Sequence, residues 1–101
     1  MNNKLLSLLG FAAKAGKLSY GFEATKYSIL SKKAKLSLVS EEISAKSQKE
    51  IIYFSDKNNI KTVILKGIDI KTMSDAVGKK CGILSVNDSG FADACLKYTQ
   101  V

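Results

Sequence analysis

The fold of this protein is decided by residues 16–36, which read GKLSYGFEATKYSILSKKAKL. The stretch predicts a loop bounded by Gly16 and Gly21, an amphipathic helix from Phe22 to about Lys32, and a strand that opens at Leu36. Glycine permits close backbone approach because it has no Cβ atom, and a helix N-terminus presents free N–H groups that suit phosphate. Five lysines lie along the stretch: Lys17, Lys26, Lys32, Lys33 and Lys35. This combination indicates nucleic-acid binding.

Helical and extended patterns alternate along the rest of the chain. Working outward, we expect a helix over residues 3–13, a short extended segment over 17–21, strands over 36–40, 60–65 and 81–86, and a helix over 44–57. A short helix should begin with Thr72 as its cap, with Asp75 three residues later, and end at Gly78. Residues 87–89 should cap a last helix. This alternation predicts an α/β fold whose small sheet is covered by helices on both faces.

The apolar positions predict where the core lies. In the helix that starts at Phe22, we expect Phe22, Ile29 and Leu30 to face the core. Cys81 and Cys95 do not form a CxxC pair, so they are expected to be buried thiols and not a metal or redox site.

Length and composition favour one RNA-binding domain over residues 1–101, acting as a monomer. Hydrophobic residues make up 46% of the chain and charged residues 25%, which is typical of a folded globular protein. No apolar run approaches the roughly 20 residues that span a bilayer, so we expect no membrane partner and a cytoplasmic location.

The positive charge is concentrated at one end of the sequence. The net charge is +7, and residues 1–36 hold seven lysines against a single acidic residue, Glu23. A basic region of this kind is the electrostatic signature of a nucleic-acid binder. Because the chain has no arginine, phosphate contacts must come from lysines and backbone N–H groups.

These motifs carry a resemblance to a known family. The run Gly16-Lys17, Gly21-Phe22, Thr25 and Ala34-Lys35-Leu36 resembles the ribosomal protein family typified by archaeal L7Ae and eukaryotic L30e. Two further segments are similar to the short bacterial YlxQ-type members: residues 8–12 (LLGFA), and residues 78–92 with Gly78-Lys79-Lys80 at their start and Asn87-Asp88-Ser89-Gly90-Phe91-Ala92 at their end. The resemblance covers nearly the whole chain.

The resemblance implies a three-layer α-β-α sandwich with a small mixed sheet that binds kink-turn RNA, a sharply bent duplex with tandem sheared G·A pairs beside a bulge. It implies that Gly21, Phe22, Glu23 and Ala24 approach the G·A pairs. It also implies that a second loop near Lys79, Lys80 and Cys81 holds the bulged nucleotides.

Each candidate RNA-binding residue also has a structural interpretation. Lys17, Lys26, Lys79 and Lys80 would neutralise phosphates, or they form an ordinary solvated surface. Gly21 allows close approach to RNA, or it serves a turn that needs positive φ.

The two side chains after Gly21 have the same two possible roles. Glu23 accepts from base N–H groups, or it favours the first turn of its helix. Phe22 stacks on a base, or it packs in the core.

We therefore expect a non-enzymatic protein that binds rRNA or another kink-turn RNA, with no catalytic residues, metal or cofactor. The sequence shows no P-loop, no dinucleotide-binding fingerprint and no histidine. The alternatives are a protein-interaction module of the same fold, or an accessory RNA-binding domain related to RNA ribose methyltransferases.

Overall fold

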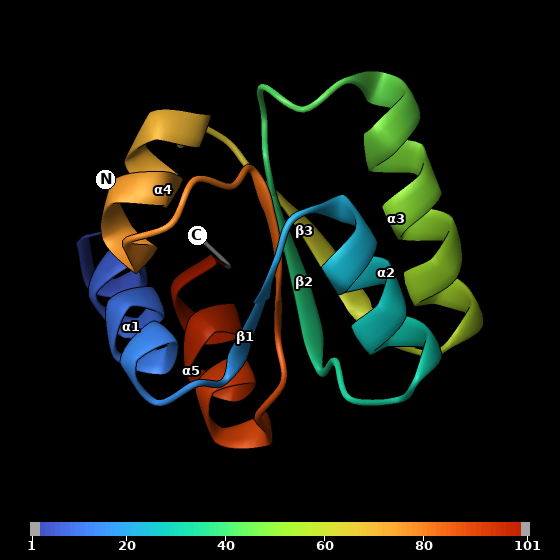
Figure 1. Ribbon diagram of the computed structural model, residues 1–101, viewed down its shortest axis with the longest axis horizontal. Coiled ribbons are helices and arrows are strands. Elements are labelled where there is room, and N and C mark those ends of the chain that lie inside the picture. The colour runs from blue at the N-terminus through green and yellow to red at the C-terminus, as the bar shows by residue number, and fades with distance from the viewer. Residues whose placement is uncertain (1–2, 100–101) are drawn as a thin grey trace.

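The computed structural model describes residues 3–99 and contains helices and strands in alternation (Figure 1). The helices are α1 (Asn3–Lys14), α2 (Phe22–Leu30), α3 (Ala45–Lys57), α4 (Ile70–Val77) and α5 (Ser89–Thr99). The strands are β1 (Leu18–Tyr20), β2 (Leu36–Ser40), β3 (Lys61–Leu65) and β4 (Ile83–Val86). Their order is the predicted one, and most boundaries lie within two residues of those expected.

The strands form one mixed sheet in the order β1-β4-β2-β3. Strand β4 runs antiparallel to both of its neighbours, whereas β2 and β3 are parallel. Helices α1, α4 and α5 cover one face of the sheet, and α2 and α3 cover the other (Figure 1). The expected three-layer α-β-α sandwich with a small mixed sheet is confirmed.

Each face of the sheet has its own hydrophobic core. Strand β2 contributes to both because successive side chains point to opposite faces. Leu36 and Leu38 pack in the core under α1, α4 and α5, whereas Val39 packs in the smaller core under α2 and α3. All the residues of β2 and β4 are buried, which confirms the expectation that the sheet is covered on both faces.

Helix α2 is shorter than predicted and buries a different set of residues. It ends at Leu30, whose side chain is 51% exposed, so the prediction that Leu30 is a core residue was wrong. The buried stripe is Thr25, Ser28 and Ile29, at the spacing of one helical face. Short side chains at two of these positions let α2 approach the sheet, where Ser28 Oγ lies 2.7 Å from Ser19 Oγ of β1.

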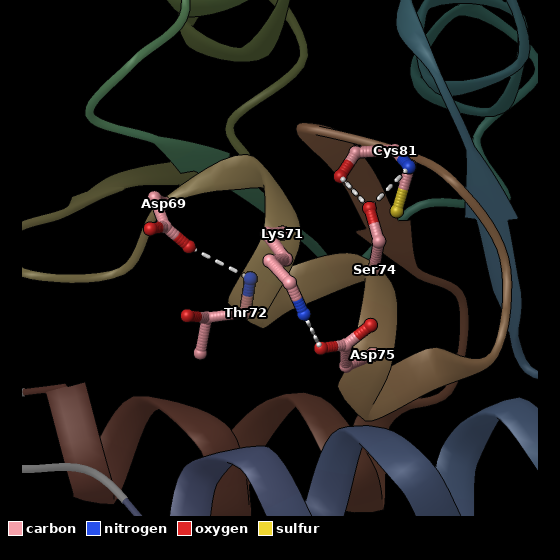
Figure 2. A network of polar contacts seen from close by, with 6 residues as sticks. All are labelled: Asp69, Lys71, Thr72, Ser74, Asp75 and Cys81. Atoms are coloured by element: carbon pink, nitrogen blue, oxygen red, sulfur yellow. Dashed lines mark hydrogen bonds and ion pairs between the residues drawn. The ribbon is translucent and has the colours of Figure 1, made fainter.

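The predicted cap of α4 was also wrong. The helix starts at Ile70, and its N-cap is Asp69, whose carboxylate accepts a 2.7 Å hydrogen bond from the Thr72 amide. Asp75 is no part of a cap and instead forms an ion pair with Lys71 at 2.8 Å. Figure 2 shows both interactions. The predicted end of the helix at Gly78 is confirmed, in a left-handed conformation.

The two cysteines are buried and unpaired, as expected. Burial raises the pKa of the Cys95 thiol to about 11 and also raises that of Cys81. Within residues 3–99, no helix is long and apolar enough to cross a membrane.

Candidate RNA interface

Gly21 lies where three elements meet at one end of the sheet. It follows β1 and precedes α2, and its amide donates a 2.7 Å hydrogen bond to the carbonyl of Ile83 at the start of β4. Its backbone angles, φ 90° and ψ 170°, belong to a region that is open essentially only to glycine. No atom lies within 4 Å of the position that a Cβ would occupy, so the surface beside Gly21 is open. The turn that needs positive φ, one of the two possible roles of Gly21, is therefore present.

The first turn of α2 sends its side chains in opposite directions. Phe22 is half-buried and packs against the core under α2 and α3, whereas Glu23 is exposed. The structural role expected for Phe22, packing against the core, is therefore observed. Glu23 also lies in the first helical turn, where a carboxylate is favoured by the helix dipole.

The loop between α4 and β4 reaches the same end of the sheet (Figure 1). The antiparallel pairing of β1 with β4 sets Tyr20 opposite Leu84, so the residues before β4 lie beside those after β1. The ammonium of Lys79 lies 5.1 Å from the centroid of the ring of Tyr20, the residue that precedes Gly21 in the chain. We call Tyr20, Gly21, Glu23, Lys79 and Lys80 the sheet-end surface.

The conformation of this loop is held by Ser74 of α4. Its hydroxyl contacts both backbone groups of Cys81, as Figure 2 shows. Tyr20 is partly buried against the core on this side, and that burial, together with the Cys81 thiol, raises the pKa of its hydroxyl. The tyrosine hydroxyl is protonated at neutral pH, as an unshifted tyrosine with a pKa of about 10 would be.

A groove of about 840 Å³ runs beside β1 and α2. We call it the lysine groove because three lysines line it together with Glu23 and the exposed ring of Tyr27. Its lining residues are Gly16, Lys17, Leu18, Ser19, Glu23, Ala24, Tyr27, Ser28, Lys33, Lys35 and Asn87. Lys33 lies over Tyr27, with its ammonium 5.8 Å from the ring centroid. Cations and an exposed aromatic ring are together typical of surfaces that bind single-stranded or unstacked nucleic acid.

Backbone pairing brings the ends of three strands together at this groove. The Asn87 amide donates to the Lys17 carbonyl at 2.8 Å, and the Lys35 amide donates to the Val86 carbonyl at 2.8 Å. These bonds set Lys17 and Lys35 on either side of the end of β4, although the sequence separates them by a whole helix. Their charges therefore act on the same part of the surface.

A polar network fixes the side chains at the base of the lysine groove. The Asn87 side-chain amide donates to Ser19 Oγ at 2.9 Å, and its carbonyl accepts from Ser85 Oγ at 2.9 Å. Ser19 in turn contacts Ser28 of α2. The network joins β1, β4 and α2, so the backbone segments that carry the groove lysines are held in fixed relative positions.

Lys26 does not join the other predicted lysines. Its ammonium lies 4.7 Å from the ring centroid of Phe54 in α3, and it does not line the lysine groove. The structure thus divides the predicted residues into three groups. Gly21, Lys79 and Lys80 lie at the sheet end, Lys17 lines the lysine groove, and Phe22 and Lys26 face α3 and its core. Glu23 belongs both to the sheet-end surface and to the lining of the lysine groove.

Sequence reasoning did not identify Tyr27, Ser19 and Asn87 as candidates. Tyr27 follows Glu23 by four residues, a spacing that sets two side chains on the same helix face, so this signal was present in the sequence. Ser19 and Asn87 come together only through the β1–β4 pairing, for which no local pattern exists.

The arrangement is suited to binding anionic and polar groups. Within the described part of the chain, no three His, Cys, Asp or Glu side chains are grouped to hold a metal ion. The groups that the surface offers are ammonium donors, hydroxyls, amides, one carboxylate and aromatic rings. These are the contacts that proteins use for phosphates, base edges and base faces.

Comparisons with known proteins give one family and one fold. The sequence matches the model described as the Ribosomal protein L7Ae/L30e/S12e/Gadd45 family over residues 3–96. No curated protein matches it. Among solved structures, a protein of unknown function from Bacillus halodurans is similar, with a TM-score of 0.92, 23% sequence identity, and coverage of 97% of this chain and 98% of that one. At this identity, the structural likeness shows the fold alone.

Proposed function

Because the chain belongs to the ribosomal protein L7Ae/L30e/S12e/Gadd45 family, we propose that it is a ribosome-associated RNA-binding protein of the cytoplasm. We propose further that it acts as a monomer and recognises kink-turn-like RNA through the β1–α2 loop and the N-terminus of α2. Membership in this family supports the RNA-binding part of the proposal.

The observation that carries the proposal is that the start of α2 and the α4–β4 loop meet at one end of the sheet. The Gly21–Ile83 hydrogen bond and the Lys79–Tyr20 contact hold the start of α2 and the α4–β4 loop on one surface. A bent duplex presents two backbones at an angle, so it can be contacted from two adjacent loops. The helix N-terminus supplies N–H groups and the loop supplies two ammonium groups.

The lysine groove extends this surface along α2. Lys17, Lys33 and Lys35 would follow the phosphates of one strand away from the bend. Glu23 lines the same groove two residues after Gly21, where a carboxylate would repel phosphate but can accept from a base amino group. The mechanism is therefore positioning and charge neutralisation of RNA, and no covalent bond is made or broken.

A salt-series titration of the protein with a kink-turn hairpin tests the proposal. The control RNA carries Watson–Crick pairs in place of the tandem G·A pairs. The double variant Lys79→Ala/Lys80→Ala tests the interface, and Lys46→Ala/Lys49→Ala on the exposed side of α3 is the matched control with the same loss of charge.

We expect tight binding of the kink-turn RNA, weaker binding of the control RNA, and a loss of affinity for Lys79→Ala/Lys80→Ala that exceeds the loss for the matched control. Equal binding of both RNAs would reduce the function to non-specific attraction by lysines. No binding at moderate salt would overturn the RNA proposal and favour a protein partner.

A further inference from the structure

A second groove lies on the other side of Tyr20, between α1 and α4. Its volume is about 500 Å³. We call it the α1–α4 groove. It is lined by Ser7, Gly10, Phe11, Ala13, Lys14, Tyr20, Asp75, Ala76, Val77 and Gly78. None of these residues except Tyr20 belongs to the sheet-end surface, and none lines the lysine groove.

Small residues form the middle of the α1–α4 groove. A Cβ atom at Gly10 would lie 3.1 Å from the Ala76 carbonyl oxygen, so the absence of a side chain there lets the two helices approach closely. Phe11 and Tyr20 add aromatic rings to the lining, and Phe11 is 61% exposed. The small side chains therefore leave room for a flat ligand, which can stack on the exposed ring of Phe11.

The charge around the α1–α4 groove matches a polyanion. Lys14 is part of its lining, and Lys79 lies over the ring of Tyr20, which the groove shares with the sheet-end surface. Asp75, the acidic residue of the lining, is already paired with Lys71 at 2.8 Å. The groove is thus a continuation of the sheet-end surface, with cations at the junction.

We propose that the α1–α4 groove binds one unstacked nucleobase from a single-stranded RNA segment that passes Lys79 on its way from the sheet-end surface. The inference rests on the proposed RNA-binding function and adds a separate subsite to it. Phe11 would stack on the base, and Lys14 and Lys79 would contact the flanking phosphates.

The polar groups of the α1–α4 groove favour a base that carries an amino group. The ion pair with Lys71 uses Asp75 Oδ2, so Oδ1 remains an acceptor, and backbone carbonyls at the C-terminal end of a helix have no partners within the helix. Adenine offers an exocyclic amine to such acceptors and a large face for stacking. Uracil has no exocyclic amine, offers acceptors only its N3–H between two carbonyl oxygens, and stacks less well, so adenine should bind in preference to uracil.

Amide chemical shifts measured by two-dimensional NMR, with the tetranucleotides rA4 and rU4 as probes, test the inference. We expect rA4 to shift the amides of Gly10, Phe11, Tyr20, Ala76 and Gly78, and rU4 to bind more weakly at the same place. Phe11→Ala should weaken rA4 binding about five-fold or more, because stacking on an aromatic ring is lost. Phe11→Tyr should retain it.

The matched control is Tyr53→Ala, which removes another aromatic side chain of similar exposure, 53%, from the far side of the molecule on α3. Shifts confined to the lysine groove would overturn the inference, as would shifts scattered over all lysines or equal effects of Phe11→Ala and Tyr53→Ala. An absence of binding at millimolar rA4 would overturn it too.

A separate titration with a kink-turn duplex that has no single-stranded tail reports on the proposed function alone, through the amides of Gly21 and Ala24. If that duplex fails to bind while rA4 shifts the α1–α4 groove, the bent-RNA proposal falls and the nucleobase subsite stands. If the duplex binds while rA4 leaves the groove unchanged, the subsite falls and the proposed function stands.

Discussion

A single hydroxyl group, that of Ser74, satisfies both backbone groups of Cys81: it accepts from the Cys81 amide at 3.0 Å and donates to the Cys81 carbonyl at 3.1 Å (Figure 2). Ser74 belongs to α4, and Cys81 lies just before β4. The loop that carries Lys79 and Lys80 is therefore closed at its base by a side chain, and its shape does not depend on strand pairing alone.

Ser74→Ala should loosen this loop. Loss of the hydroxyl leaves the Cys81 backbone groups without their partner, which should lower the free energy of unfolding by about 1–2 kcal/mol. Burial raises the pKa of the Cys81 thiol, so opening the loop should lower that pKa and speed the reaction with Ellman's reagent at pH 8. Cys95, whose pKa is about 11, is the internal control and should stay unreactive. An unchanged rate of reaction of Cys81 with Ellman's reagent would show that the Ser74 hydrogen bonds do not hold the loop.

Gly21→Ala should destabilise the protein through its backbone alone. The residue has φ 90° and ψ 170°, and no atom would contact the new methyl group. A non-glycine residue in such a region costs about 1–3 kcal/mol. Urea denaturation followed by circular dichroism measures this cost, and kink-turn RNA affinity should fall in parallel because the start of α2 shifts. A fully stable variant would show that the chain readily adopts another conformation here.

Asp69→Ala should lower the melting temperature at neutral pH because α4 loses its cap. Hydrogen bonding from Thr72, helped by the charge of Lys71, holds the pKa of Asp69 below its usual range. A carboxylate with a depressed pKa stabilises the folded state above its unfolded pKa, about 3.9, and this contribution is lost as the pH falls through the folded value. The difference in melting temperature between wild type and Asp69→Ala should therefore narrow below about pH 4. Asp69→Asn keeps a cap without a titrating group, so its melting temperature should depend less on pH than that of wild type.

Lys17→Ala should weaken RNA binding more than Lys26→Ala does. Lys17 lines the lysine groove, whereas the ammonium of Lys26 lies over the Phe54 ring. Each lost phosphate contact should reduce the slope of log affinity against log salt by roughly 0.7–0.9. The slope should change for Lys17→Ala and stay near the wild-type value for Lys26→Ala. Equal salt slopes for the two variants would show that RNA does not contact the lysine groove through Lys17.

Lys32→Gly should stabilise the protein. Lys32 has φ 68°, in the left-handed region that favours glycine, and follows Ser31, the C-cap of α2. Relief of this conformation should be worth about 1 kcal/mol, reduced by loss of the exposed hydrogen bond from Lys32 to Asn58. Thermal unfolding measures the net effect. A lower melting temperature would show that the Asn58 contact outweighs the backbone strain.

Local patterns in the sequence were enough to predict most of the fold. Alternating apolar segments and their glycine boundaries located every helix and strand, because periodicity and turn chemistry are short-range properties. The start of α4 was missed because Asp69–Thr72 and Thr72–Asp75 have the same capping spacing. Packing decides between them: Ile70 lies against Gly82, where an added Cβ would come within 2.9 Å of its side chain. A helix that begins at Ile70 sets this partly buried side chain against Gly82.

The candidate site could be predicted only in part. Gly21 and Glu23 follow from the loop and helix signals, and Lys79 and Lys80 from the glycine before them. The side on which Lys26 lies depends on where α3 packs, which no local pattern reports. The neighbours Lys17, Lys35 and Asn87 are brought together by hydrogen bonds between distant strands.

The strand pairing also sets the order in which the protein can mature during synthesis. Residues 18–20 have their sheet partners at residues 84–86, so β1 has no strand to pair with until the last part of the chain has left the ribosome. The Gly21–Ile83 bond and the Lys79–Tyr20 contact arise at the same late moment. A nascent or truncated chain that lacks β4 thus cannot assemble the sheet-end surface, so the RNA binding that we propose there requires a chain synthesised at least through β4.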